Sequence, residues 1–319
     1  MNAANSLTGS VRLSHWGALR ARGADAASFL NGQLTNDFER LGLAHARLAG
    51  YCSAKGRLLA TFVGWREEPE DVILACSSDL LAPMLKRLSM FVLRAKCKLS
   101  DASSEVLLEG LVGSAGELSI TELAPEEVWG RGRQGQVTII RLPDAQGLQR
   151  WLRATVGQPG EAMSGEVPAQ GSLTLEQWRW LEVMSGVPMI EKATSELFVP
   201  QMVNLELAGG VSFQKGCYPG QEVVARAQYR GTVKRRAFLF QAPGEAAAQP
   251  GQEVFVESDA GQPAGVVVMV ASSPTDSSSA TLIELKLAAW NAAPVHLGSA
   301  DGPVLAPIAP PFPIELDAA

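Results

Sequence analysis

Hydrophobic and polar positions in the first hundred residues follow the period of strands in some stretches and that of helices in others. Leucines recur at helical spacing over residues 78–90, which predicts a helix there. A shorter helix is expected after Asp25, because aspartate favours the N-cap position. The other apolar runs are predicted strands, at 10–20, 48–52, 57–65, 71–76 and 92–99. A glycine-containing turn at 53–56 joins the second and third of these strands as a hairpin.

After residue 100 the pattern weakens and then gives one clear helix. Strands are expected at 106–112 and 137–142, and a stretch rich in glycine and small residues predicts a surface loop at 157–171. Apolar residues then share one face of a predicted helix over 174–185, which Gly186 ends. Strands and helices in this order indicate an α+β fold, with helices on one face of a sheet.

Short strands separated by glycine and proline dominate the chain beyond Gly231. This alternation predicts a small antiparallel barrel or sandwich as a separate C-terminal domain at 231–319, after a first region at 1–230. The proline-rich stretch 307–313 is expected to be irregular. The predicted strands of the C-terminal domain are 236–241, 253–257, 265–271 and 280–286.

Composition narrows the functional classes. The 319 residues are 46% hydrophobic and 19% charged, which fits a globular chain with two or three domains. A net charge of -6 argues against a nonspecific nucleic-acid binder, and the basic run 234–236 is expected to be a solvated strand edge. Four scattered cysteines indicate a reducing cytoplasm, and neither a membrane span, a secretory signal nor a metal site is expected. Nothing in the sequence demands association, so we expect a monomer.

The segment 213–226 contains the strongest candidate for chemistry. Cys217 lies in a turn between Gly216 and Gly220, directly before a predicted short helix. A thiol at that position feels the positive end of the helix dipole, and Lys215 adds a nearby cation. Both effects favour the reactive thiolate, although a tight turn that holds an inert cysteine is an equally good reading of the local pattern.

Three stretches of the chain resemble one known family. Lys-Gly-Cys-Tyr-Pro-Gly-Gln-Glu at 215–222 resembles the signature of the YgfZ family, the folate-binding proteins of iron–sulfur cluster maintenance. That family is related to the T-protein of the glycine cleavage system, an aminomethyltransferase. Residues 29–37 with 52–57 resemble its N-terminal block, and 197–204 with 209–210 resemble the approach to the cysteine.

The resemblance implies a T-protein-like fold, with mixed subdomains around a central channel that holds tetrahydrofolate. It implies an accessory protein that supports iron–sulfur assembly or repair in client enzymes, including those that modify tRNA. Folate and iron–sulfur client or assembly proteins would then be its partners, without stable nucleic-acid binding. Two alternatives stay open: a tetrahydrofolate-dependent one-carbon transferase, and an adaptor that docks clients on its C-terminal β-domain.

Two carboxylates are candidates for the pterin, whose amino group and ring N–H form adjacent donors. Glu182 lies where the T-protein family has an Arg-x-Glu-x-Gly region. Counted from Gly186, however, the family's glutamate position is Met184 here, so Glu182 is displaced. Asp37 is the second candidate and Asn36 a further ligand contact. A solvated helical glutamate and a turn aspartate are the corresponding structural interpretations.

Cations and rings complete the predicted folate site. Lys55 and Arg57 flank a glycine in a turn, and Arg226 and Arg230 are four residues apart, on one face if the helix persists. They are candidates for the anionic glutamyl tail, and Tyr218 for a ring contact. Solvated charges and core aromatic residues are the alternative readings, and the same holds for three further rings, Trp16, Tyr51 and Phe213.

Overall fold

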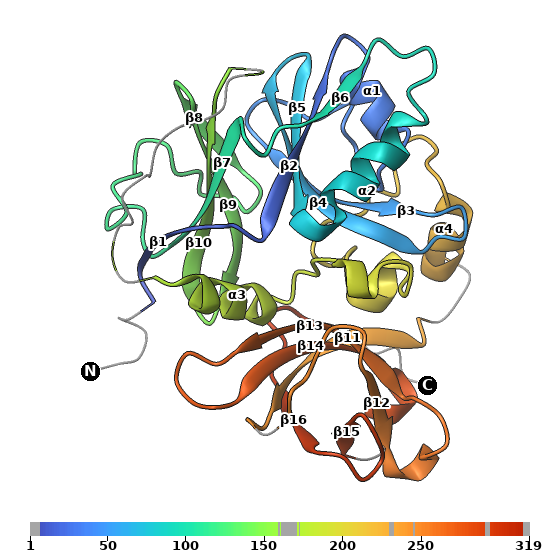
Figure 1. The fold of residues 1–319 in the computed structure, drawn as a ribbon. Helices are drawn as coiled ribbons and strands as arrows, with labels where there is room; N and C mark the ends of the chain where they lie inside the picture. The colour runs from blue at the N-terminus through green and yellow to red at the C-terminus, as the bar shows by residue number, and fades with distance from the viewer. Residues whose placement is uncertain are drawn as a thin grey trace.

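The computed structural model describes residues 7–158, 160, 171, 173–229, 233–244, 246–290 and 294–314. Two five-stranded antiparallel sheets lie side by side, and a closed six-stranded barrel lies below them (Figure 1). The predicted α+β class and the C-terminal β-barrel are confirmed. The predicted boundary at 230/231 stays a prediction, and the barrel strands run from Arg235 to Ile308.

The first sheet is built from the early alternating segments, in the order β3-β4-β5-β2-β6. The predicted hairpin forms β3 and β4, which a turn at Ser53–Gly56 connects. Helices α1 (Ala26–Asn31) and α2 (Ser78–Ser89) cover it (Figure 1). Its strands are β2 (Trp16–Arg22), β3 (Ala46–Cys52), β4 (Leu58–Glu68), β5 (Asp71–Ser77) and β6 (Lys98–Asp101).

The second sheet has the order β1-β7-β10-β9-β8 and takes its edge strand β1 from the start of the chain. The two sheets are therefore interleaved in sequence. Helix α3 (Leu175–Met184) has Thr174 as its N-cap residue, and Thr174 and Gln177 form a reciprocal capping box. The strands are β1 (Gly9–Arg12), β7 (Val106–Val112), β8 (Arg131–Gln134), β9 (Val137–Ala145) and β10 (Leu148–Val156).

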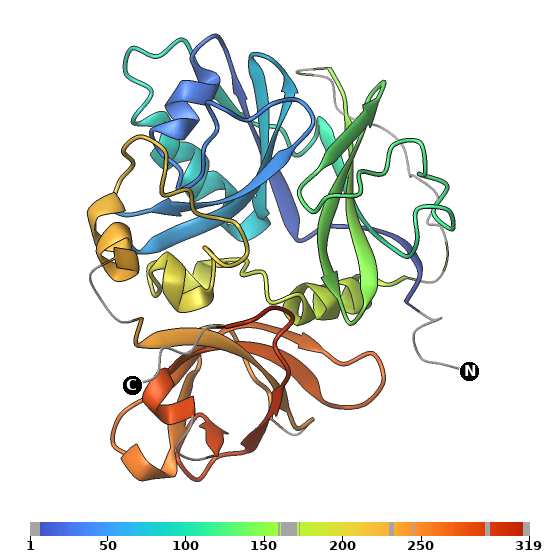
Figure 2. The same cartoon turned by 180° about the vertical axis from the view of Figure 1, so that it is seen from behind.

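The barrel closes in the order β11-β14-β13-β12-β15-β16 and has a hydrophobic core of its own. Its outer face packs against α3, so α3 lies between the second sheet and the barrel (Figure 2). Its strands are β11 (Arg235–Ala242), β12 (Glu253–Val256), β13 (Gly265–Ser272), β14 (Ser279–Lys286), β15 (Val295–Leu297) and β16 (Val304–Ile308). The short helices are α4 (Gln221–Tyr229), α5 (Leu287–Trp290), η2 (Lys192–Thr194), η3 (Pro200–Val203) and η4 (Glu257–Asp259).

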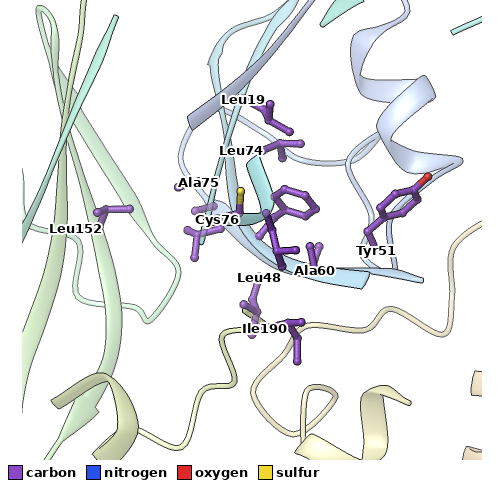
Figure 3. Close-up of a cluster of buried hydrophobic side chains, with 14 of the residues drawn as sticks. Leu19, Leu48, Tyr51, Ala60, Leu74, Ala75, Cys76, Leu152 and Ile190 are labelled. Carbon is purple, nitrogen blue, oxygen red and sulfur yellow. The ribbon is translucent and has the colours of Figure 1, made fainter. Parts of the chain in front are cut away.

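Buried side chains of the first sheet form the largest core. Figure 3 shows aliphatic residues of β2 to β5 gathered above Ile190, which follows α3, while Leu152 of β10 points across from the other sheet toward Cys76. The interior therefore continues from one sheet to the other. The residues that Figure 3 labels on the first sheet are Leu19, Leu48, Tyr51, Ala60, Leu74, Ala75 and Cys76.

Several predicted elements differ from the structure. The strand expected at 10–20 is two strands, because the chain turns at Leu13 and passes from one sheet to the other. The strand expected at 92–99 is wrong except at its end, because residues 92–97 form a loop before β6. Strands β8, β10 and β15 were not predicted, and neither was β16, which takes up part of the expected irregular stretch 307–313.

One predicted helix start is confirmed in position and one needs correction. Asp25 is the N-cap residue of α1, as expected, but its carboxylate accepts a hydrogen bond from the Lys96 backbone N–H and none from the helix. Helix α4 begins at Gln221, two residues after the proline expected at its first position. The loop predicted at 157–171 falls mostly outside the described residues.

Candidate functional site: a pocket at the junction of three subdomains

A pocket lies where the two sheets, α3 and the barrel meet; we call it the junction pocket. Most of the lining is apolar, with two charged side chains among it. The lining residues are Trp16, Leu48, Thr61, Phe62, Val63, Ala75, Cys76, Trp129, Leu142, Pro143, Arg150, Glu182, Ser185, Val187, Pro188, Met189 and Met269.

Glu182 brings a carboxylate to this pocket from the last turn of α3. Its side chain is only 6% exposed, and each oxygen has one protein partner. Trp16 Nε1 donates to Oε1 at 2.9 Å, and His15 Nε2 lies 2.8 Å from Oε2. A carboxylate can accept about four hydrogen bonds, so these contacts orient Glu182 and leave acceptor capacity for a ligand.

Arg150 of β10 is the second charged group of the pocket. Its Nη1 donates to the Leu181 carbonyl at 2.7 Å, and its guanidinium lies 4.8 Å from the Trp178 ring centroid. Burial lowers the pKa of Arg150 to about 10, while the nearby charge of Glu182 opposes that shift. Its Nε has no hydrogen-bond partner within the described chain. A buried guanidinium with a free donor is suited to a carbonyl or carboxylate oxygen.

The walls suit a flat heteroaromatic ring. Trp16, Phe62 and Trp129 contribute aromatic surface, and Met189 and Met269 contribute flexible thioethers. Acceptors on Glu182 and a donor on Arg150 thus border an apolar space. This arrangement can bind and orient a polar ring that presents donors on one edge and an oxygen on another.

The cysteine segment lies elsewhere. Cys217 is exposed, and Lys215 Nζ donates to the carbonyls of Asn31 and Leu34 at the end of α1. The same ammonium lies 4.7 Å from the Tyr218 ring centroid. Burial lowers the pKa of Lys215 to about 8, and the charge of Asp37 opposes that shift. Burial raises the pKa of Tyr218.

Close backbone packing fixes this segment against the β3–β4 turn. Gly220 has φ +77°, and a Cβ added there would lie 2.4 Å from the Ser53 carbonyl oxygen and 2.6 Å from Gly56. Glycine is therefore required at 220 for both conformation and space. Figures 1 and 2 both show α4, which follows Gly220, well separated from α3 across the molecule.

The remaining predicted contacts have structural partners. Asn36 Nδ2 donates to the carbonyls of Leu48 and Gly209 at 2.8 and 2.7 Å. Asp37 accepts from the Arg40 backbone N–H at 3.0 Å. Both side chains therefore organise the chain after α1, and neither lines the junction pocket.

The predicted cations lie outside the pocket as well. Lys55 is exposed in the hairpin turn, and Arg57 donates to the Leu197 carbonyl. Arg226 is exposed and pairs with Glu222 at 2.9 Å. Arg230 lies outside the described residues.

Of the described residues that the sequence suggested as folate or thiol site candidates, the structure therefore places only Glu182 at the junction pocket. Trp16, expected as a ring contact, lies there too. Lys215, Cys217 and Tyr218 form a separate group at the end of the hairpin. The sequence analysis missed Arg150, His15 and Trp129. An arginine beside Trp151 in an apolar run at 148–156 could have signalled a strand that carries a buried cation.

Within the described residues no group of His, Cys, Asp and Glu is arranged to hold a metal ion. A membrane-crossing helix would need a long apolar stretch, and none of the described helices has one.

Comparisons with known proteins give one fold and one family. The fold is similar to that of glycine cleavage system aminomethyltransferase T from Bartonella henselae, with a TM-score of 0.71 over 96% of this chain and 86% of that one, at 15% identity. The predicted T-protein-like fold is thereby confirmed. No family model matches the sequence.

Curated relatives share the name expected from the cysteine motif. The chain is 32% identical over 253 residues to the tRNA-modifying protein YgfZ of Edwardsiella ictaluri, covering 74% of this chain and 71% of the relative. It is 29% identical over 254 residues to the YgfZ of Cronobacter sakazakii, covering 77% and 75%. The resemblance seen in three stretches of the sequence is thus confirmed over most of its length, and the chain belongs to the family of the tRNA-modifying protein YgfZ.

Proposed function

We propose that the chain is a folate-binding accessory protein that holds a tetrahydrofolate derivative in the junction pocket. In that role it supports the assembly or repair of iron–sulfur clusters in client enzymes, including enzymes that modify tRNA. The observation that carries the folate part is the buried, oriented carboxylate of Glu182 in an otherwise apolar pocket.

The residues present fit a reduced pterin. Glu182 would accept from the pterin amino group and ring N–H, and the free Nε of Arg150 would donate to an oxygen of the ligand. Trp16, Phe62 and Trp129 would enclose the ring and exclude water. When bound, a reduced folate supplies a carrier for one-carbon units. The protein's own contribution is to hold and orient it.

Cys217 supports the accessory part of the proposal. Its thiol is exposed, and it follows an ammonium held at the end of α1. A thiol at the surface can meet a client protein, whereas the three other cysteines are buried or half-buried. Pocket and thiol are separate, so folate binding and cysteine chemistry would be two functions of one molecule.

Calorimetry with tetrahydrofolate tests the folate part. Glu182→Gln keeps the size of the side chain but removes its charge. We expect binding to weaken roughly 10- to 100-fold, because hydrogen bonds to charged groups contribute about 1.5–3 kcal/mol each. Glu222→Gln, at an exposed glutamate of α4, is the matched control and should bind like the wild type.

The outcomes separate the competing functions. Undiminished binding by Glu182→Gln would exclude this pocket as the pterin site. Release of a one-carbon unit from an amine, dependent on tetrahydrofolate, would favour a transferase like the enzyme that shares the fold. Fold likeness does not by itself establish that activity.

A further inference from the structure

The segment 90–98, Met-Phe-Val-Leu-Arg-Ala-Lys-Cys-Lys, exposes large apolar side chains in one place. Leu93 is 85% exposed, Met90 58% and Phe91 45%. Other exposed large apolar residues are scattered along the chain, whereas these three fall within four consecutive positions. Single exposed apolar residues are ordinary, but a contiguous group of them indicates an interaction surface.

Cations flank this apolar group along the chain. Lys86 lies in the last turn of α2, and Arg94, Lys96 and Lys98 follow it along the segment. All four are exposed, and none forms an ion pair with another described residue. Their charge is therefore available to a partner, on a chain whose net charge is -6.

The backbone of the segment is held in place, so the exposure is built into the fold. Asp25 accepts a hydrogen bond from the Lys96 N–H at 2.7 Å and donates its own N–H to the Lys96 carbonyl at 3.2 Å. Gly23, with φ +130°, allows this approach, because a Cβ there would lie 2.0 Å from the Lys96 carbonyl oxygen. Val92 and Ala95 pack against the core between the exposed residues. A fixed apolar surface binds at a lower entropic cost than one that must first become ordered.

From this we infer that the segment 90–98, with Lys86, is a docking surface for an acidic amphipathic segment of a partner protein. The partner would place apolar side chains on Met90, Phe91 and Leu93, and its Asp or Glu side chains would meet the cations. The inference rests on the proposed accessory function and specifies the chemistry of the client.

A protein fits this surface better than RNA or a lipid bilayer. Only one of the three exposed apolar residues, Phe91, has a ring on which a base could stack, and Met90 and Leu93 bury better against other side chains.

The place of the surface agrees with a role in client handling. Figures 1 and 2 show the segment, in teal, at the outer end of the first sheet beside α1 and far from the barrel. Asp25, just before α1, holds the segment, and the carbonyls at the other end of α1 hold Lys215. A client docked there would lie one short helix away from the cysteine segment.

Short random peptides displayed on phage provide the test. Selection on the wild-type chain should enrich peptides that combine Leu, Phe or Trp with Asp or Glu. A selected peptide, measured by fluorescence anisotropy, should bind the variant Leu93→Ser/Arg94→Glu/Lys96→Glu at least 10-fold more weakly. Its affinity for the wild type should fall as salt rises, because exposed charges are screened over about 8–10 Å at physiological ionic strength. The control variant Val304→Ser/Lys234→Glu changes exposed residues of the barrel and should bind like the wild type.

Retained tetrahydrofolate binding and an unchanged melting temperature in the triple variant would show that it is folded with its pocket intact. A failure of docking is therefore distinguishable from a failure of the folate proposal. Enrichment without acidic residues, or equal binding by the triple variant, would overturn the inference. The inference would also be overturned if the wild type and the control variant bound tRNA or phosphatidylserine vesicles and the triple variant did not. The surface would then serve RNA or a membrane.

Discussion

At the scale of single residues, burial separates the four cysteines. It raises the pKa of Cys52 and Cys76 to about 12 and that of Cys97 to about 11, whereas Cys217 is exposed. Cys217→Ser should fold like the wild type but fail to restore tRNA modification in a strain that lacks the protein, since serine cannot form a comparable nucleophile. Cys97→Ser is the control that should complement. Full complementation by Cys217→Ser would exclude thiol chemistry.

Lys215 gives a prediction about pH. Because burial lowers its pKa to about 8, it should lose its proton well below the usual lysine range near 10.4. About half of it would be neutral, and therefore reactive, at pH 8. Competitive acetylation followed by mass spectrometry should show Lys215 reacting with an apparent pKa near 8. A midpoint near 10 at Lys215 would contradict this.

At the scale of secondary-structure elements, the position of α3 depends on one glycine of β7. A Cβ added to Gly110 would lie 2.3 Å from the Trp178 ring, which anchors α3 to the second sheet. Gly110→Ala should lower the free energy of unfolding by about 1–3 kcal/mol, the usual cost of overpacking. Denaturant titration measures this, and Gly116→Ala, where the added Cβ has open space, should change stability little.

The same substitution should weaken tetrahydrofolate binding, because α3 carries Glu182 and its Leu181 carbonyl holds Arg150. Unchanged binding in a destabilised Gly110→Ala variant would mean that α3 tolerates displacement without loss of the site.

At the scale of the whole molecule, the junction pocket joins the three subdomains. Its lining includes Phe62 of β4, Arg150 of β10 and Met269 of β13. A ligand bound there should slow amide hydrogen exchange in β4, β10, α3 and β13 together. Its binding stabilises the arrangement in which these elements enclose the pocket. Exchange measured with and without tetrahydrofolate tests this. Protection confined to residues 213–229 would instead place the ligand at the cysteine segment.

The local pattern of apolar, polar and turn residues predicted the elements whose buried face can be recognised from residues adjacent in the sequence. The β3–β4 hairpin, α2, α3 and the barrel strands β11 to β14 follow from alternation, helical spacing and turn glycines. The motif at 215–222 identified the family, because it requires seven defined positions in eight residues. In contrast, the apolar run at 92–99 misled the strand prediction. Its backbone is fixed by Asp25 and Gly23 from a distant part of the chain, and its most apolar exposed side chain, Leu93, faces solvent.

The α+β class, the C-terminal barrel and the family follow from the sequence alone. Which distant residues share a site depends on how the elements pack in three dimensions. Hydrophobic periodicity indicates which face of a helix or strand is buried, but not which other element packs against that face. Trp16, Arg150 and Glu182 could therefore not be placed in one site from the sequence alone. The same reason explains why Asn36 and Asp37, which belong to the motif block 29–37, bind the backbone around α1 and β3, while the junction pocket is built from both sheets, α3 and the barrel.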